Sequence, residues 1–117
     1  MGGGDVMTGP FPIDEIELRV DAGKAGVYVF TRRMPTPHYV GRSDTCLLKR
    51  MPVSVEEGAG YTYFWFEYCN SPRAAYYREC ELFHQFEPPD NTNHPAVPKR
   101  QRWRCPIDDC DWAPLDS

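Results

Sequence analysis

The chain has 117 residues, of which 41% are hydrophobic and 26% are charged. This length predicts a single domain, and the composition excludes an intrinsically disordered chain. No apolar run approaches the ~20 residues that cross a bilayer, and the first residues, MGGGDVMTGP, lack the basic and apolar parts of a secretory signal. We therefore expect a cytoplasmic protein with no membrane partner.

The formal net charge of −4 conceals two basic segments. Residues 31–50 hold five basic side chains against one acidic, and residues 99–104, KRQRWR, hold four basic side chains and no acidic one. Such segments are either solvated loops or contacts for the phosphates of a nucleic acid, and charge alone leaves both interpretations open.

The first elements are expected as follows. Residues 1–12 show no periodic pattern and are predicted to be frayed. Residues 16–20, IELRV, alternate apolar and charged side chains, which predicts an edge strand. Residues 26–30 and 38–41 are rich in β-branched and aromatic side chains, so they predict two antiparallel strands joined by a loop.

A short helix and a further strand are expected next. Ser43 is a suitable N-cap for a helix over residues 44–51, and Pro52 is expected to end it. Residues 61–69, YTYFWFEYC, form a nearly continuous aromatic run, as in a strand covered on both faces. This run is predicted to be the central strand of the sheet.

The last helix and the tail have clear boundaries. Ser71 and Pro72 predict an N-cap and first helical residue, with the helix continuing to about Phe86. Beyond it, half of the twelve prolines occur in a stretch without periodicity. We therefore predict a domain over residues 13–93 and an extended, proline-rich tail over residues 94–117 that packs on it.

Glu79 lies in the middle of the apolar stripe of that last helix. At about 100° per residue, it shares the stripe with Ala75, Leu82, Phe83 and Phe86. A buried carboxylate needs a cation beside it. The pattern is compatible with an internal salt bridge to an arginine and with a functional carboxylate.

Two tripeptides on the predicted strand pair carry a resemblance. GVY at residues 26–28 and YVG at residues 39–41 are followed by an arginine, Arg50, on the first helix and by Glu79 on the second. This ordered set, over about residues 26–93, resembles the GIY-YIG nuclease domain. The segment AAYYRECELFH around Glu79 is similar to the glutamate helix of that family.

The resemblance implies an α/β (α+β) domain with a central antiparallel sheet flanked by two helices. It also implies an endonuclease that hydrolyses DNA with Mg²⁺ or Mn²⁺, in repair, recombination or mobile-element processing, with a protein partner supplying specificity. Glu79 becomes the metal ligand. The catalytic residues it indicates are Tyr28, Tyr39, Arg50, Glu79 and Asn93, with Asn91 as the alternative asparagine. DNA contacts are then expected from Arg42, Lys49, Lys99, Arg100 and Arg102.

The chemistry of these residue types agrees with that activity. The planar guanidinium of Arg50 matches two phosphate oxygens and stays charged at neutral pH. A single carboxylate with waters and substrate oxygens is how Mg²⁺ is usually held. Tyr28 would need a lowered pKa to act as a base, which a nearby cation can supply. Without Arg50 and Glu79, the two tyrosines would be read as cross-strand packing.

The chain departs from the family pattern after Arg50. Family members often carry a histidine or tyrosine four residues later, where this sequence has Ser54, and Pro52 is expected to have ended the helix before it. One residue is also inserted between the YVG motif and Arg50. These departures leave a second interpretation, a catalytically weak or inactive nucleic-acid-binding module of the same fold.

The tail offers a competing metal site. His94, Cys105 and Cys110 are possible zinc ligands, but a Cys-x4-Cys spacing is loose for zinc and no fourth ligand is evident, so no zinc is expected. The five cysteines are an odd number with irregular spacing and are expected to be reduced thiols. Trp103 is expected to stack on a base or to anchor the tail. A zinc-stabilised protein-interaction domain is therefore the third interpretation.

Overall fold

The computed structural model describes residues 7–58, 60–107 and 110. In chain order its elements are β1 (Thr8–Pro12), the 3-10 turn η2 (Ile13–Glu15), α1 (Ile16–Arg19), β2 (Gly26–Thr31), β3 (Tyr39–Ser43), α2 (Leu47–Glu57), β4 (Tyr63–Tyr68) and α3 (Pro72–Phe86).

Four antiparallel strands form one sheet in the order β1-β4-β2-β3. Strand β2 lies between β4 and β3 and is buried along its whole length. Its Tyr28 pairs with Gly41 of β3 on one side and with Phe66 of β4 on the other. The expected class, a small α/β domain around a central antiparallel sheet, is confirmed, and both β2 and β4 are interior strands.

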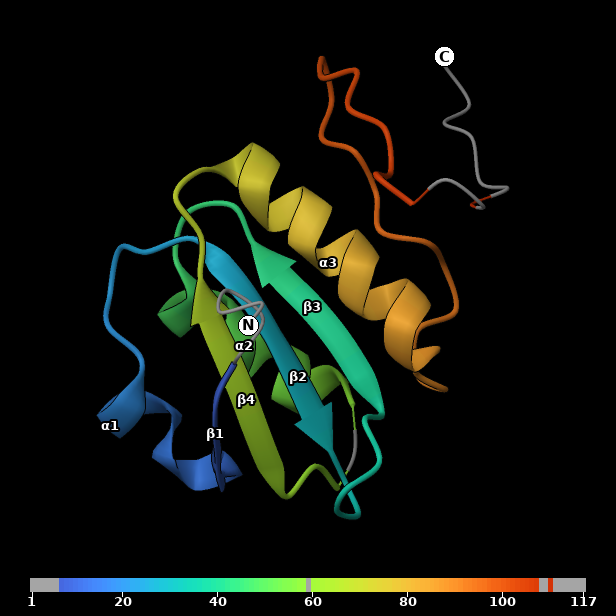
Figure 1. The fold of residues 1–117 in the computed structure, drawn as a ribbon. Coiled ribbons are helices and arrows are strands. Elements are labelled where there is room, and N and C mark those ends of the chain that lie inside the picture. Colours follow the sequence, from blue (N-terminus) through green and yellow to red (C-terminus); the bar gives the residue numbers. More distant parts are fainter. Residues whose placement is uncertain (1–6, 59, 108–109, 111–117) are drawn as a thin grey trace.

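The sheet carries a helix on each face, as Figure 1 shows. Successive side chains of a strand point to opposite faces. Tyr28 accordingly lies in one hydrophobic cluster with Met51 of α2, whereas Val27 and Val29 lie in a second cluster with Leu82 of α3. The two clusters form separate core layers above and below β2.

The N-terminal segment differs from expectation in two places. Residues Thr8–Pro12, expected to be frayed, form β1 and pair with β4, where the Phe11 ring lies 5.8 Å from that of Phe64. Residues 16–20, expected to be an edge strand, form the helical turn α1, which buries Ile16 and Val20 four residues apart. Strand β1 occupies the edge of the sheet beside β4, so residues 16–20 have no strand to pair with there. They bury their apolar side chains from a helical turn instead. Residues 1–6 lie outside the described residues.

Helix α2 also differs from expectation. It begins after Cys46 and runs through Pro52 to Glu57. Ser43 does not cap it but accepts hydrogen bonds from the backbone of Thr45 and Cys46 in the preceding turn. Pro52 costs one helical hydrogen bond. The buried residues on either side of it, Met51 and Ser54, keep the helix against the sheet.

Helix α3 has the expected limits. The Ser71 hydroxyl accepts a hydrogen bond from the backbone N–H of Ala74 at 3.0 Å, Pro72 is the first residue, and Phe86 is the last. Glu87 closes the helix in the left-handed conformation. The described part of the tail lies along α3 (Figure 1), with the Trp103 ring 5.8 Å from that of Tyr76. Within the described residues, no helix has the length and apolar character to cross a bilayer.

Candidate active site

A cleft of about 240 Å³ brings together five of the site residues expected from the sequence, the four catalytic candidates Tyr28, Tyr39, Arg50 and Glu79 and the expected DNA contact Arg42. Its lining consists of Tyr28, Tyr39, Gly41, Arg42, Asp44, Arg50, Glu79 and Ala96. They come from β2, β3, the turn before α2, α2 itself, α3 and the tail. Residues 68 positions apart in the chain therefore face one space.

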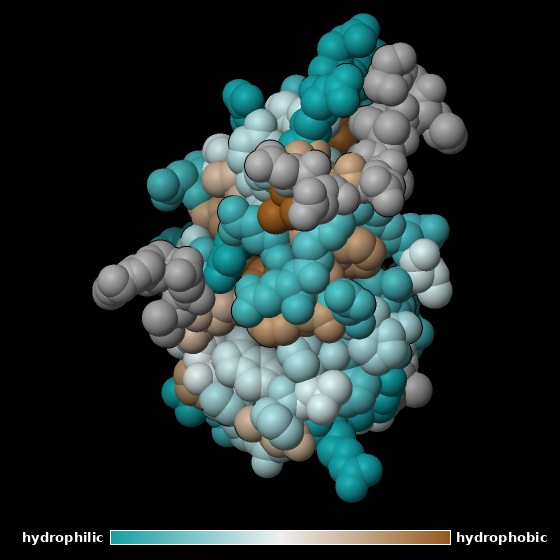
Figure 2. All heavy atoms as spheres, turned by 45° about the vertical axis from the view of Figure 1, so that its right-hand side comes forward, coloured by the Kyte–Doolittle hydropathy of each residue, from teal (hydrophilic) through white to brown (hydrophobic). Residues whose placement is uncertain are grey.

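The cleft lies across β3, an edge strand of the sheet. Tyr28 and Tyr39 belong to the core layer under α2, and Glu79 extends from α3 on the opposite face. Among the described residues, no strand pairs with the outer edge of β3, so side chains from the two faces of the sheet meet around it. Figure 2 turns the side of β3, α3 and the tail forward, and hydrophilic side chains cover most of the face that it shows.

Gly41 is required by its closeness to Tyr28. A Cβ atom on Gly41 would lie 2.5 Å from the Tyr28 hydroxyl oxygen and 2.7 Å from Cε2. Any larger residue would push the ring away, so the glycine of the YVG motif lets the tyrosine of the GVY motif cross β3 into the cleft.

Tyr28 and Ser54 form a buried hydroxyl pair, with Tyr28 Oη and Ser54 Oγ 2.7 Å apart. Burial raises the pKa of Tyr28, the charge of Tyr39 adds to the increase, and Arg50 opposes it. A base at this position would need a lowered pKa, and the pKa of Tyr28 is instead raised. Ser54 reaches Tyr28 because Pro52 does not end α2.

Glu79 is paired with an arginine inside the protein. Its Oε1 accepts a hydrogen bond from Arg42 Nη1 at 2.7 Å, and the two side chains are only 10% and 13% exposed. Arg42 also donates to Asp44 Oδ1 at 2.9 Å and to the Ala96 carbonyl at 2.7 Å. Burial raises the pKa of Glu79, and Arg42 opposes this. Within the described residues, Glu79 Oε2 makes no hydrogen bond.

Arg50 is held much more loosely than Arg42. Its side chain is 43% exposed, and the carboxylate beside it, that of Glu57, is 3.7 Å away and itself mostly exposed. An ion pair of this kind contributes little. Arg50 also interacts with Tyr28 and Tyr39 across the cleft. Of the two arginines that line the cleft, Arg50 is therefore the one whose guanidinium is free to reorient towards an anion such as a phosphate.

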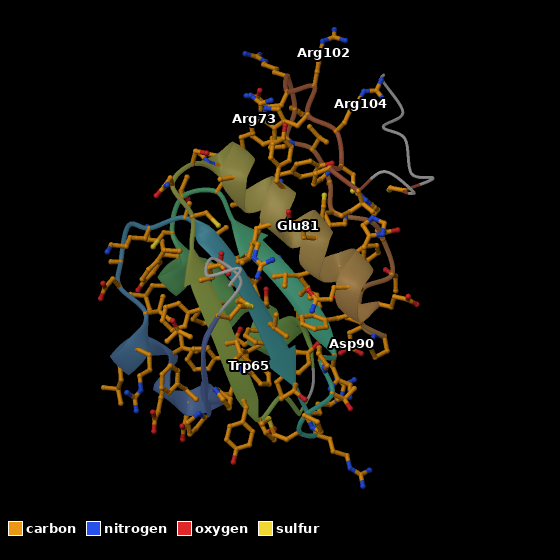
Figure 3. All side chains as sticks on the ribbon, in the orientation of Figure 1. Trp65, Arg73, Glu81, Asp90, Arg102 and Arg104 are labelled. Carbon is orange, nitrogen blue, oxygen red and sulfur yellow. The ribbon has the colours of Figure 1, made fainter. Side chains whose placement is uncertain are left out.

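The residues expected to contact DNA fall into three places. Arg42 is held by the protein's own acceptors inside the cleft. Lys49 is exposed at the start of α2. Lys99, Arg100 and Arg102 are exposed in the tail, where Figure 3 shows Arg102 and Arg104 at the same end of the molecule as Arg73 of α3.

The two candidate asparagines lie outside the cleft lining. Asn91 binds the outer edge of β3 with both ends of its amide: Nδ2 donates to the Val40 carbonyl and Oδ1 accepts from the Val40 N–H, each at 2.8 Å. Asn93 is exposed. Of the two, Asn91 has the contact that positions β3.

Three residues at the site, Asp44, Ser54 and Ala96, were not expected there from the sequence. Asp44 was visible only as the one acidic residue of the basic segment 31–50, and Ser54 only as a departure from a family pattern. Ala96 contributes a backbone carbonyl, for which the sequence carries no signal.

Comparison with known proteins agrees with this architecture. No protein-family model matches the chain, and no curated protein matches it in sequence. In structure, the chain is similar to the GIY-YIG N-terminal endonuclease domain of UvrC from Thermotoga maritima, whose crystal structure has its catalytic divalent cation, magnesium, bound. The TM-score is 0.58 at 22% identity, covering 68% of this chain and 96% of that domain. The fold is therefore that of a GIY-YIG domain.

Proposed function

We propose that this chain is a Mg²⁺-dependent endonuclease of the GIY-YIG type that hydrolyses DNA phosphodiester bonds. The observation that supports it is the meeting of Tyr28, Tyr39, Arg50 and Glu79 in one cleft of a fold similar to the UvrC endonuclease domain. Phosphodiester hydrolysis needs a proton acceptor for water, positive charge for the phosphoryl oxygens and stabilisation of the leaving alkoxide. These four residues supply the proton acceptor and the positive charge. They also supply a ligand, Glu79, for the metal ion that would stabilise the leaving alkoxide.

The donor atoms of the cleft fit Mg²⁺. This ion prefers oxygen ligands and is usually held by one or two carboxylates with waters and substrate oxygens. Glu79 keeps Oε2 without a hydrogen bond in the described part of the chain, and the Asp44 carboxylate lines the same cleft. Bound there, Mg²⁺ would supply positive charge at the scissile phosphate and the leaving oxygen.

The protein side chains divide the remaining work. Arg50 binds the phosphate through its fork of N–H donors, because its ion pair with Glu57 is long and exposed to solvent. Tyr28 keeps its proton, since burial raises its pKa, and with Ser54 it orients the bound phosphate or water. Tyr39 lines the same cleft beside Arg50, and we assign to it the relay of the proton that leaves the attacking water.

A binding module without turnover is the second candidate function. The observation that favours it is the ion pair between Arg42 and Glu79, because an arginine occupies one oxygen of the expected metal ligand. Such a module would bind DNA through the exposed basic residues of α2 and the tail. The two candidates differ in whether bound DNA is cut.

The test uses the full chain with supercoiled plasmid and with branched and single-stranded oligonucleotides, in Mg²⁺, Mn²⁺ or EDTA. We expect Mg²⁺-dependent nicking that Glu79→Gln lowers by more than about 100-fold. The same substitution is expected to cost only about 1–2 kcal/mol of stability, because Arg42 keeps Asp44 and Ala96 as acceptors. Cleavage is read on gels and stability by urea unfolding.

Two matched controls separate the site from surface charge. Glu81→Gln is the control for Glu79→Gln, because it removes an exposed carboxylate two residues further along α3. Arg33→Ala is the control for Arg50→Ala in the cleft, because it removes an exposed arginine of the loop after β2. Both controls should leave cleavage unchanged. A wild-type chain that binds these DNAs but cuts none with either metal would favour the binding module. Cleavage at the wild-type rate by Glu79→Gln would overturn the role of Glu79.

A further inference from the structure

A second cluster of metal-binding side chains lies outside the cleft, between α3 and the tail. His84 comes from α3, His94 from the start of the tail, and Cys105 and Cys110 from further along it. One ligand atom from each of the four lies within 4.8 Å of the other three. Residues separated by up to 26 positions in the sequence converge on this point.

His84 contributes a buried ring nitrogen to this cluster. Its Nε2 is buried and, within the described residues, has no hydrogen-bond partner. A polar atom left in this state costs about 1–3 kcal/mol. Most such atoms in folded proteins have a partner, so an orphaned imidazole nitrogen beside two thiols indicates a ligand.

His94 is oriented as a ligand of the same point. Its Nδ1 lies 3.0 Å from the Pro95 carbonyl and its Nε2 lies 3.4 Å from Cys110 Sγ. A neutral ring that donates from Nδ1 presents the Nε2 lone pair to the cluster, and metal-binding histidines are commonly fixed in this way.

The donor set and its dimensions suit zinc. Two thiolates and two imidazoles around one tetrahedral ion form a Cys₂His₂ site, with bonds of about 2.3 Å to sulfur and 2.0–2.1 Å to nitrogen. In such a tetrahedron the ligand atoms lie roughly 3.3–3.8 Å apart, so the widest pair here would close by about 1 Å. Two soft thiolates with imidazoles favour Zn²⁺ over the oxygen-seeking Mg²⁺.

We propose that His84, His94, Cys105 and Cys110 bind one structural Zn²⁺ that ties the tail to α3. Binding replaces the protons of the two thiols with the metal, so each Zn²⁺ taken up releases two protons, and no oxidant or reductant is involved. No zinc was expected from the sequence, because a fourth ligand was not evident. The fold supplies that ligand as His84, which the spacing of the tail residues does not reveal.

The zinc would also stabilise one wall of the cleft. Ala96, two residues after His94, is the tail residue whose carbonyl accepts from Arg42, and it lines the cleft. His84 lies on the same helix as Glu79. Fixing His94 to His84 therefore holds Ala96 over Arg42. The proposed site is independent of the nuclease proposal, because metal content is measured without DNA.

The experiment measures zinc in the full chain, expressed without a histidine tag in zinc-supplemented medium, by elemental mass spectrometry after gel filtration. We expect one zinc per chain in the wild type and in Cys69→Ser, which removes a thiol outside the cluster. Cys110→Ser and His84→Asn are expected to lose most of it. Zinc well below one per chain in the wild type would overturn the proposal, as would full retention of zinc in both cluster variants.

A second measurement does not depend on variants folding. Wild-type protein stripped with a chelator is titrated with Co²⁺, and the tetrahedral sulfur-ligated ion is expected to give visible absorption bands that excess Zn²⁺ abolishes. Zn²⁺ should also raise the melting temperature of the stripped protein more than Mg²⁺ does. Absence of the Co²⁺ bands, or a disulfide between Cys105 and Cys110 in fresh protein under non-reducing mass spectrometry, would contradict a resident zinc.

Discussion

At Gly41 the backbone of β3 runs directly beside the ring of Tyr28, so the position of the phenol depends on a missing side chain. We predict that Gly41→Ala destabilises the protein by about 1–3 kcal/mol, because a Cβ there overlaps ring atoms that the buried core cannot release. The Tyr28 hydroxyl should also move away from Ser54. Urea unfolding measures the first effect, and DNA cleavage reports the second.

Tyr28→Phe is the matched control for this prediction. It removes the hydroxyl and its 2.7 Å contact with Ser54 but leaves the backbone of β3 undisturbed. Its cost is expected to be about 0.5–1.5 kcal/mol, less than that of Gly41→Ala. A Gly41→Ala protein as stable as the wild type would show that the ring can relax, and the explanation of this glycine would then fail.

Glu79 illustrates how one carboxylate can serve structure and chemistry. Arg42 compensates the cost of burying it through Oε1, and Glu79 still lines the cleft. Arg42 in turn has Asp44 and Ala96 as further acceptors. The two interpretations that the sequence left open, an internal ion pair and a functional carboxylate, are therefore compatible in this geometry.

Among the elements, α2 carries the largest local conflict, a proline in its interior. We predict that Pro52→Ala stabilises the protein by about 1–2 kcal/mol, since the backbone N–H is restored to a helix that already continues to Glu57. Thermal unfolding measures the change. Pro72→Ala is the control: there the proline is the first residue of α3, where its missing N–H costs nothing, and the change should be small or slightly unfavourable.

A loss of stability in Pro52→Ala would mean that the proline has a packing role that outweighs the lost hydrogen bond. Because Arg50 and Ser54 flank Pro52 on α2, the helix axis at this point also sets how the two residues face Tyr28. Comparing DNA binding by this variant and the wild type would show whether the irregular turn positions Arg50.

Elements with strong local signals were predictable from the sequence. The strands around Tyr28 and Tyr39 follow from β-branched and aromatic runs, and α3 follows from its Ser-Pro start. Strand β1 has no such signal, because its conformation is imposed by pairing with β4. The extent of α2 was misjudged because burial of Met51 and Ser54 outweighs a local proline rule.

The candidate site was predictable to the same degree. Glu79 is conspicuous because a charge interrupts an apolar stripe, and this depends on one helix alone. Its partner Arg42 lies 37 residues away, and the neighbour of Tyr28, Ser54, lies 26 residues away on another element. Such pairings follow from the packing of β3 between α2 and α3, which no local pattern in the chain encodes.

At the scale of the whole molecule, the stretch after α3 is tied back to the sheet by a charged cluster. Asp90 accepts two hydrogen bonds from Arg32, at 2.6 and 2.7 Å, and one from the Tyr61 hydroxyl. The Arg32 guanidinium lowers the pKa of Asp90 to about 2, and Tyr61 acts in the same direction. The charged carboxylate therefore stabilises the folded chain at neutral pH.

The pH dependence of this cluster has a defined sign. Because the folded pKa lies below the ordinary value of 3.8, the stabilisation is complete above about pH 5 and is lost as the pH falls towards 2. Asp90→Asn should cost about 1–2 kcal/mol at pH 7, reduced by the partial exposure of Arg32, and little at pH 2. Urea unfolding of both proteins across this range gives the difference directly.

The control for this prediction is Asp21→Asn. Asp21 pairs with Lys24 at 3.5 Å on the surface, where both side chains are mostly exposed. Its effect on unfolding should be small at every pH. An Asp90→Asn cost that stays constant from pH 7 to pH 2 would contradict the assignment, since a protonated Asp90 no longer differs in charge from asparagine.

The amide of Asn91 at the edge of β3 has a consequence for solubility. An edge strand offers unpaired N–H and C=O groups on which strands of other molecules can assemble into aggregates. Asn91 takes both groups of Val40, and the N–H of Asp90 takes the carbonyl of His38. Two residues thus act as a very short extra strand that blocks intermolecular β-pairing. The first half of β3, which holds Tyr39, is thereby protected from pairing with strands of other molecules. The second half, which holds Gly41 and Arg42, lines the cleft.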